Sequence, residues 1–213
     1  MKYKCIIFDC DGVLVDSESI SNATLVDMAK SIGVLIELDF AMTHFLGKSL
    51  QFCFDYIESL ASQKLPDTFE EEFRERTFEA FRTQMQPIPG VHELLSKINI
   101  DVCVASNGPA EKIRLNLTTT KLIDRFEGNI FSAYDINSWK PNPELYLHAA
   151  KSMGYSVEEC VVIEDSLAGV TAAKAGGFDV FGYTNKHNKD QFNGIDIPVF
   201  NDMKNLYLLL SKQ

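Results

Sequence analysis

The sequence contains no apolar run of the roughly 18 residues that a membrane-spanning helix requires. The apolar run near its start, CIIF, ends at Asp9 and is too short for the hydrophobic region of a secretory signal. Basic residues are also few, since 20 lysines and arginines stand against 30 acidic residues and the net charge is −10. Such a chain is unsuited to nonspecific binding of nucleic acid or of an anionic membrane. We therefore expect neither as a partner, and we expect a cytoplasmic location.

Cysteine pairs are also missing from the sequence. The five cysteines are odd in number, and no two of them have the CxxC spacing that is common in redox and zinc sites. Cys5, Cys103 and Cys160 lie inside apolar runs. This pattern predicts buried, reduced thiols and no disulfide bond.

The sequence does contain a series of short apolar runs rich in Val, Ile and Phe, with helical patterns between them. The runs are continuous, as in strands that are covered on both faces. Their alternation with helices predicts an α/β fold with a Rossmann-like parallel-sheet core and helices on both faces. The predicted strands span 4–8, 100–106, 128–133, 160–165 and 178–183, and the predicted helices span 91–98, 109–118, 143–153 and 167–175.

Residues 16–87 interrupt this alternation, because they contain no strong strand pattern. We interpret them as an inserted α-helical cap between two parts of the α/β core, at 1–15 and 88–213. The stretch QPIPG is rich in turn residues and marks the end of the insertion. Helical patterns within it span 18–32, 40–61 and 67–84.

Two aspartates follow the first apolar run, in the stretch FDCDGVLVDS. Aspartate is disfavoured in strands and is rarely buried without a partner. Two carboxylates this close repel each other unless a proton or a cation lies between them. Asp9 and Asp11 therefore either face solvent in a loop or form part of a site.

Polar residues also end other predicted strands. Ser106 and Asn107 end the second, Glu164 and Asp165 end the fourth, and the third leads through a loop to Lys140. In an open parallel sheet, ligands bind beyond the carboxyl ends of the strands. We therefore expect these side chains to meet the two aspartates at one edge of the sheet.

This set of side chains suits phosphoryl transfer. One carboxylate can attack phosphorus and form an acyl phosphate, while a second acts as general acid and base. Clustered carboxylate oxygens are ligands that Mg²⁺ prefers, and the metal would relieve the repulsion between the acids. A lysine ammonium and hydroxyl donors can hold the transferring phosphoryl oxygens. Each of these motifs is common on its own. The prediction of phosphoryl transfer depends on finding all of them, in this order, at the ends of predicted strands.

With these motifs in place, the sequence resembles the haloacid dehalogenase superfamily of hydrolases. The stretches FDCDGVLVDS, VASNG, SWKPNPE and VIEDSLAGVTAAKAGG carry the resemblance. It extends over nearly the whole chain and includes a helical cap after the first motif, as in the group of β-phosphoglucomutase and its phosphatase relatives. An acid at Asp11 is typical of the phosphatases and not of the dehalogenases.

The resemblance implies a role for each motif residue. Asp9 would be the nucleophile and a Mg²⁺ ligand. Asp11 would be the general acid and base, with its backbone carbonyl on the metal. Lys140 would bridge the nucleophile and the phosphoryl group. The remaining motif residues would bind the phosphoryl group (Ser106, Asn107) or the metal (Asp165 directly, Glu164 through water or by supporting the ligands).

Within the superfamily, the stretch AYDINSWKPNPELYLHAAKSM is similar to bacterial 6-phosphogluconate phosphatases. The resemblance implies a Mg²⁺-dependent phosphatase that hydrolyses a small sugar phosphate or sugar-acid phosphate, with 6-phosphogluconate as the best candidate. It would act through an aspartyl phosphate, as a monomer or weak dimer. Gly47, Lys48 and Ser49 look like a substrate-specificity loop, although Lys48 could equally be a solvated surface residue. Glu18 either contacts the substrate or caps the first helix of the insertion.

Two alternative functions stay open. A phosphosugar mutase of the β-phosphoglucomutase type has a His shortly after the first motif and an Arg after the Gly-x-Ser of its cap. This sequence has Ser21 and Leu50 at those places, which favours a phosphatase. A catalytically silent protein that binds phosphometabolites is disfavoured, because every motif position holds a chemically competent residue.

Overall fold

The structure is a computed structural model that describes residues 2–46 and 48–212. The chain divides into two compact units. The α/β unit consists of the chain up to Asp16 and from Gln86 onward, and the helical unit consists of Ser17–Met85. The sequence analysis places the two boundaries between the units between residues 15 and 16 and between residues 87 and 88. A role of the helical unit as a cap stays a prediction.

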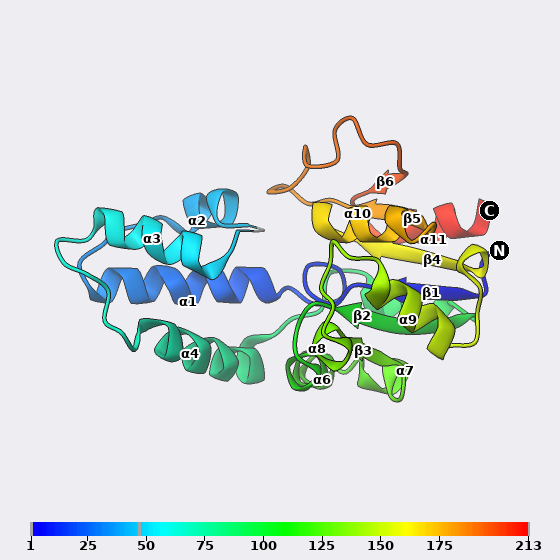
Figure 1. The fold of residues 1–213 in the computed structure, drawn as a ribbon, viewed down its shortest axis with the longest axis horizontal. Coiled ribbons are helices and arrows are strands. Elements are labelled where there is room, and N and C mark those ends of the chain that lie inside the picture. The colour runs from blue at the N-terminus through cyan, green and yellow to red at the C-terminus, as the bar shows by residue number, and fades with distance from the viewer. Residues whose placement is uncertain (1, 47, 213) are drawn as a thin grey trace. The chain divides into compact units, whose positions relative to one another are not determined.

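A six-stranded sheet in the order β3-β2-β1-β4-β5-β6 forms the centre of the α/β unit (Figure 1). Neighbouring strands are all parallel. The strand order changes direction at β1, which has β2 on one side and β4 on the other. Ligands of open parallel sheets bind beyond the strands at such a position. The strands are β1 (Cys5–Phe8), β2 (Asp101–Ser106), β3 (Ile130–Ser132), β4 (Cys160–Glu164), β5 (Asp179–Tyr183) and β6 (Val199–Phe200).

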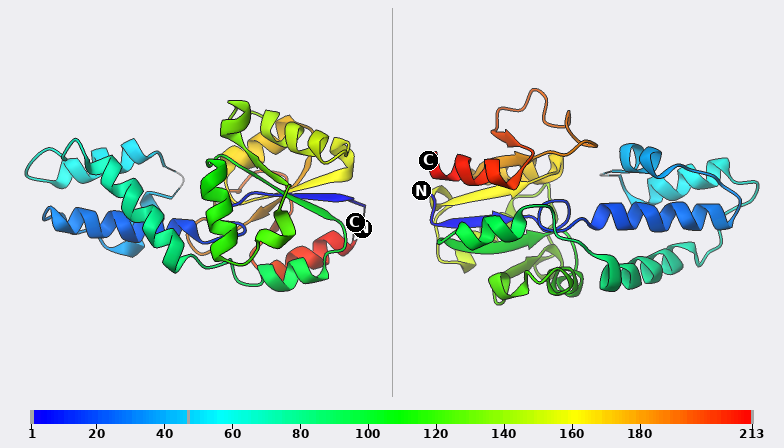
Figure 2. Two further views of the ribbon diagram at one scale, coloured as in Figure 1. Left: turned by 90° about the horizontal axis from the view of Figure 1, so that it is seen from below. Right: turned by 180° about the vertical axis from the view of Figure 1, so that it is seen from behind.

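Helices cover both faces of the sheet, as the left view of Figure 2 shows for α9 and α10 on one side and α5 and α11 on the other. Successive residues of β1 point to opposite faces. Ile7 joins a buried cluster with α9 and α10, whereas Phe8 makes an edge-to-face contact with Phe126 of α7. The helices are α5 (Val91–Lys97), α6 (Ala110–Thr119), α7 (Ile123–Phe126), α8 (Ala133–Ile136), α9 (Glu144–Ser152), α10 (Leu167–Ala175) and α11 (Met203–Lys212), with a 3₁₀ turn at Val157–Glu159.

The helical unit packs around α1, which lies between α4 on one side and α2 with α3 on the other (Figure 1). Its core is rich in aromatic rings. The Phe54 ring makes edge-to-face contacts with Phe69 and Phe73, at centroid distances of 5.4 and 5.9 Å. Such pairs add about 0.5–1.5 kcal/mol each to the effect of apolar burial. The helices are α1 (Ser17–Ser31), α2 (Leu38–His44), α3 (Leu50–Leu60) and α4 (Phe69–Gln84).

The predicted fold class is confirmed, and so are the five predicted strands and the four predicted helices between them. Within the insertion, the helical pattern predicted over 40–61 corresponds to two helices and not to one. The pattern is divided into α2 and α3, and the Ser49 hydroxyl starts α3 by accepting a hydrogen bond from the Phe52 amide at 3.2 Å. The sequence analysis also missed the two-residue strand β6 and the C-terminal helix α11.

All five cysteines are buried free thiols, which agrees with the predicted absence of disulfides. Across residues 2–46 and 48–212, no helix has the length and apolar composition that a membrane crossing would need.

Candidate active site

Three neighbouring strands deliver polar side chains to one edge of the sheet. Asp9 directly follows β1, Ser106 is the last residue of β2, and Glu164 is the last residue of β4. The residue before each of these side chains is buried and apolar, namely Phe8, Ala105 and Ile163, so the polar groups adjoin the apolar core of the sheet. The predicted meeting of the strand ends around β1 is therefore present in the structure.

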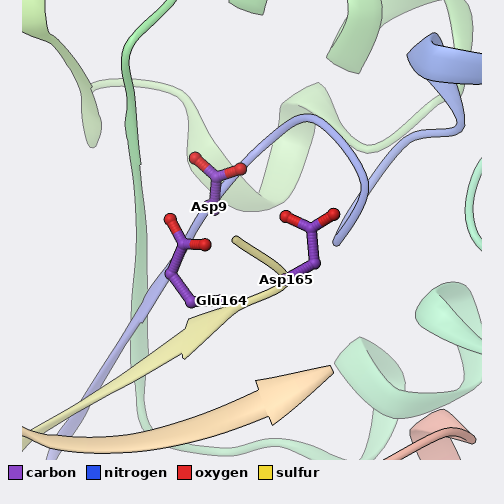
Figure 3. A group of neighbouring side chains, drawn as sticks. All are labelled: Asp9, Glu164 and Asp165. Atoms are coloured by element: carbon purple, nitrogen blue, oxygen red, sulfur yellow. The ribbon is translucent and has the colours of Figure 1, made fainter. Parts of the chain in front are cut away.

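Three carboxylates gather at this edge. One oxygen from each of Asp9, Glu164 and Asp165 lies within 4.8 Å of the others. Figure 3 shows the three side chains pointing toward one another from the ends of β1 and β4. All three residues are buried, and Glu164 is fully so. Buried carboxylates this close require nearby positive charge to stay ionised.

Lys140 supplies part of that charge. Its ammonium donates to Asp9 Oδ1 at 2.6 Å and to Glu164 Oε1 at 2.7 Å. Glu164 Oε1 also accepts from the Tyr146 hydroxyl at 2.9 Å, and Glu164 Oε2 accepts from the Ser166 amide and hydroxyl at 2.7 and 2.9 Å. Glu164 is therefore held on both oxygens by the chain itself.

The ammonium of Lys140 does not neutralise all three carboxylates of the cluster. Burial raises the pKa of Asp9 to about 7; Glu164 and Asp11 act in the same direction, and Lys140 opposes them. Burial also acts to raise the pKa of Glu164, but Lys140, the Ser166 amide and the Tyr146 hydroxyl together outweigh it, and the pKa is lowered. With these additional donors, Glu164 keeps its charged form more readily than Asp9 does. A cation beside Asp9 and Asp165 would favour the ionised Asp9 that a nucleophile requires.

Two glycines make room for the carboxylates. A Cβ atom at Gly12 would lie 2.1 Å from Asp165 Oδ2, and Gly12 has a φ of +79° that favours glycine. A Cβ atom at Gly169, in the first turn of α10, would lie 1.8 Å from Glu164 Oε1. Any larger residue at either position would displace a carboxylate of the cluster.

Asn107 fixes the loop that carries Lys140. Its Oδ1 accepts from the Lys140 backbone amide at 2.8 Å, and its Nδ2 donates to the Lys140 carbonyl at 3.4 Å. The side chain predicted to hold a phosphoryl group therefore pairs with the backbone of the predicted phosphoryl-binding lysine. The nearby Ser106 hydroxyl accepts from the Gly108 amide at 3.1 Å and keeps its own proton for another acceptor.

Asp11 has surroundings of its own, and these involve two residues that the sequence analysis missed. Its Oδ2 accepts from the Lys112 ammonium at 2.9 Å, and its Oδ1 accepts from Asn116 Nδ2 at 3.4 Å. Lys112 and Asn116 are four residues apart and so share one face of α6. That spacing, directly after the Ser-Asn-Gly stretch, was the available signal. The carboxylate of Asp11 is about a quarter exposed, in contrast to the buried cluster.

The predicted substrate residues belong to the helical unit. Glu18 lies in the first turn of α1, where the helix dipole favours its charge. Lys48 is exposed, with its ammonium 5.6 Å from the centroid of the Phe52 ring. Ser49 is the N-cap of α3, and Gly47 lies outside the described residues. A contact of any of these residues with substrate stays a prediction.

The sequence matches a known enzyme family. A family model of haloacid dehalogenase-like hydrolases matches residues 3–177. The chain belongs to this family, and the predicted resemblance is confirmed.

Individual relatives specify the reaction class. The 6-phosphogluconate phosphatase of Escherichia coli is 34% identical over 190 residues, which cover 88% of this chain and 86% of that protein. Hexitol phosphatase B of Escherichia coli is 30% identical over 174 residues, which cover 79% and 78%. The crystal structure of a conserved haloacid dehalogenase-like protein from Agrobacterium tumefaciens matches with a TM-score of 0.89 and 29% identity, over 99% of this chain and 98% of that one. The chain is thus a phosphatase, which hydrolyses phosphoric monoesters.

Proposed function

We propose that the protein is a Mg²⁺-dependent phosphatase that hydrolyses a small sugar phosphate or sugar-acid phosphate through an aspartyl phosphate at Asp9. The observation that carries this proposal is the buried carboxylate cluster with Lys140 in direct contact with Asp9. A carboxylate held by an ammonium, at the carboxyl end of a strand where ligands of parallel sheets bind, has the placement that a nucleophile requires.

Two successive displacements at phosphorus account for the reaction. In the first, a carboxylate oxygen of Asp9 bonds to phosphorus as the ester P–O bond breaks, and Asp11 donates its proton to the departing sugar oxygen. In the second, Asp11 takes a proton from water as that water attacks phosphorus, which breaks the acyl phosphate and releases inorganic phosphate. Lys140 and the Ser106 hydroxyl would stabilise the charge on the phosphoryl oxygens.

The donor set fits Mg²⁺. Asp9, Glu164 and Asp165 offer three carboxylates against the one ammonium of Lys140, which leaves two negative charges for a divalent cation to neutralise. Asp9 and Asp165 would hold it, with the backbone carbonyl of Asp11. Glu164 would support them, because its two oxygens are engaged by Lys140, Tyr146 and Ser166. When bound, the cation supplies charge neutralisation for the approach of a phosphate dianion.

The best-supported substrate is 6-phosphogluconate. The support comes from the relative that carries this activity in its name, which aligns with 88% of this chain. A second relative is named for hexitol phosphates, so sugar-derived phosphates as a class are favoured. Lys48 is the residue of the helical unit that we propose pairs with the substrate carboxylate.

A phosphate-release screen tests this proposal. The purified protein is assayed with Mg²⁺ against 6-phosphogluconate, hexose phosphates, hexitol phosphates, phosphoglycolate and nucleotides, with Asp9→Asn as the blank. We expect 6-phosphogluconate to give the highest kcat/KM. A higher kcat/KM for another sugar phosphate would change the substrate but keep the reaction. Weak release from all substrates would contradict the proposal and would direct attention to a mutase, which needs a sugar bisphosphate, or to a binding protein.

A further inference from the structure

The loop between β5 and β6 carries three side-chain amides at regular intervals. Asn185, Asn188 and Gln191 are each three residues apart in the stretch NKHNKDQ. Asn188 is buried and Gln191 is partly buried, although the intervening Lys189 and Asp190 are exposed. Amide side chains in a loop are usually solvated, so their burial calls for a partner inside the molecule.

That partner is the backbone carbonyl of Asp165. Asn188 Nδ2 donates to the Asp165 oxygen at 3.3 Å, and Gln191 Nε2 donates to the same oxygen. The two amides are more than twenty residues away from Asp165 in sequence. Asp165 itself lies between the end of β4 at Glu164 and the N-cap of α10 at Ser166. The loop thus reaches the single residue that joins these two elements.

The loop is built to hold the two amides in place. The backbone amide of Asn185 donates to Asn188 Oδ1 at 2.6 Å. This contact orients the Asn188 side chain so that its Nδ2 faces Asp165. The backbone amide of His187 donates to Asn185 Oδ1 at 2.8 Å, and the backbone amide of Gln191 donates to the backbone carbonyl of Asn188 at 3.1 Å. These hydrogen bonds within the loop restrict the positions of Asn185, Asn188 and Gln191 relative to one another.

An apolar anchor ties this network to the core. Phe192 directly follows Gln191 and is buried in the cluster that contains residues of α9 and α10. Its ring lies against Gly182 of β5, where a Cβ atom would come within 2.8 Å of the ring. The amides therefore have a fixed base on the sheet.

On its other side, the Asp165 carboxylate lies close to the backbone of the first motif. The place of a Cβ atom at Gly12 is only 2.1 Å from Asp165 Oδ2. The carboxylate thus occupies the space that Gly12 leaves open, and the backbone carbonyl is held by Asn188 and Gln191. In this arrangement an oxygen of the Asp165 carboxylate lies within 4.8 Å of oxygens of Asp9 and Glu164.

We propose that Asn188 and Gln191 are positioning residues that orient Asp165 as a ligand for the divalent cation. They act through the Asp165 backbone and not by touching the cation or the substrate. This inference rests on the proposed Mg²⁺ site. Residues that orient metal ligands in this way typically change metal affinity or activity by about 10–100-fold when they are mutated.

Calorimetric titration of the full-length protein with MgCl₂ tests the proposal. The variants are Gln191→Met and Asn188→Leu, which remove the amide donors at similar volume and add no charge near the cation. We expect each to weaken Mg²⁺ binding by about tenfold. The Mg²⁺ concentration for half-maximal phosphate release should rise by the same factor, whereas kcat at saturating Mg²⁺ stays close to that of the wild type. Asn193→Ala is the matched control, because the side-chain amide of this exposed loop residue donates to Asp190 of the same loop at 3.4 Å.

Thermal unfolding in the presence of a chelator separates positioning from simple stabilisation. If both variants melt at lower temperature but bind Mg²⁺ like the wild type, the positioning role is overturned. Asp165→Asn is measured in parallel to test the metal site itself. Loss of Mg²⁺ binding in Asp165→Asn, together with unchanged affinity in both amide variants, would overturn this inference and leave the proposed function intact. Absence of Mg²⁺ binding by the wild type would overturn both.

Discussion

In the α/β unit, ionised side chains are buried next to one another, whereas in the helical unit they stay at the surface. Asp9, Lys140 and Glu164 are all buried and in direct contact. The helical unit has ion pairs such as Arg74 with Glu70, but both side chains are at least half exposed. Among the described residues of the helical unit, no buried side chain is ionisable except the Cys53 thiol. Burying charge is costly unless it serves an interaction that requires it, so the α/β unit is where we place the chemistry.

The difference also shows in what holds each unit together. The helical unit depends on an aromatic and aliphatic core, and its exposed ion pairs contribute little. The α/β unit has an apolar core as well, but its sheet edge carries a network in which each polar group depends on the others. Substitutions of the same chemical kind should therefore have very different effects in the two units.

The largest expected effect is on turnover. Asp9→Asn should lower kcat by about 10⁴-fold or more, because it removes the nucleophile. Asp55→Asn makes the same change at an exposed site of the helical unit and should leave kcat unchanged. Steady-state phosphate release, with circular dichroism to verify folding, measures both. Comparable losses in the two variants would remove the contrast between the units.

The next largest effect depends on the leaving group. Asp11→Asn should lower kcat by about 10²–10⁴-fold with a sugar phosphate, because the departing alkoxide needs a proton. An activated aryl phosphate has a leaving group that needs no proton, so formation of the acyl phosphate should be affected much less. Rapid-quench measurement of the first turnover with each substrate tests this. Equal losses in that step with both substrates would exclude a general-acid role for Asp11.

Stability should also respond differently in the two units. Lys140→Met leaves Asp9 and Glu164 buried without their common cation, and we expect it to cost about 3–5 kcal/mol of unfolding free energy. Denaturation with urea in the presence of a chelator measures this change. A cost below about 1 kcal/mol would mean that the pair behaves like an exposed one.

Metal removal should have a smaller effect on stability. Mg²⁺ at a hundredfold excess over its dissociation constant should raise the unfolding free energy by about 2.7 kcal/mol relative to the chelated protein. The same urea titration with and without Mg²⁺ tests this. Asp165→Asn should abolish the increase, and an undiminished increase in that variant would place the cation elsewhere.

The smallest effect is expected in the helical unit. Arg74→Met breaks the exposed pair with Glu70 on α4 and should cost at most about 0.5 kcal/mol. It is the counterpart of Lys140→Met, since each removes one cation from a carboxylate. A loss similar to that of Lys140→Met would show that burial does not explain the difference between the units.

The sequence predicted the site correctly for residues whose positions are set by the ends of strands. Asp9, Glu164 and Asp165 could be brought together from sequence alone, because parallel strands end at the same edge of a sheet. Lys112 was missed, since its partner Asp11 lies 101 residues away and no strand end marks the lysine, although its spacing with Asn116 on one helix face was a signal. The helical pattern over 40–61 did not separate α2 from α3, although the sequence analysis placed a loop at Gly47, Lys48 and Ser49, and Ser49 is a residue typical of a helix N-cap.

The loop after β5 shows a further limit of pattern reasoning. Asn188 and Gln191 lie in a polar stretch that resembles any surface loop, and their burial depends on the anchor at Phe192. β6 has only two residues, so it leaves no periodic signal. Contacts that depend on where a loop folds back must therefore be read from the structure.

The most direct test of the account is to trap the phosphoryl group on the protein. Asp11→Asn is mixed with an activated aryl phosphate and Mg²⁺, so that the acyl phosphate forms but its hydrolysis lacks a general base. The mixture is quenched, reduced with borohydride, which converts an acyl phosphate to an alcohol, and analysed by peptide mass spectrometry. We predict homoserine at position 9, dependent on both substrate and Mg²⁺. Burst release of the aryl alcohol with an unmodified Asp9 would contradict the central claim that this carboxylate is the nucleophile.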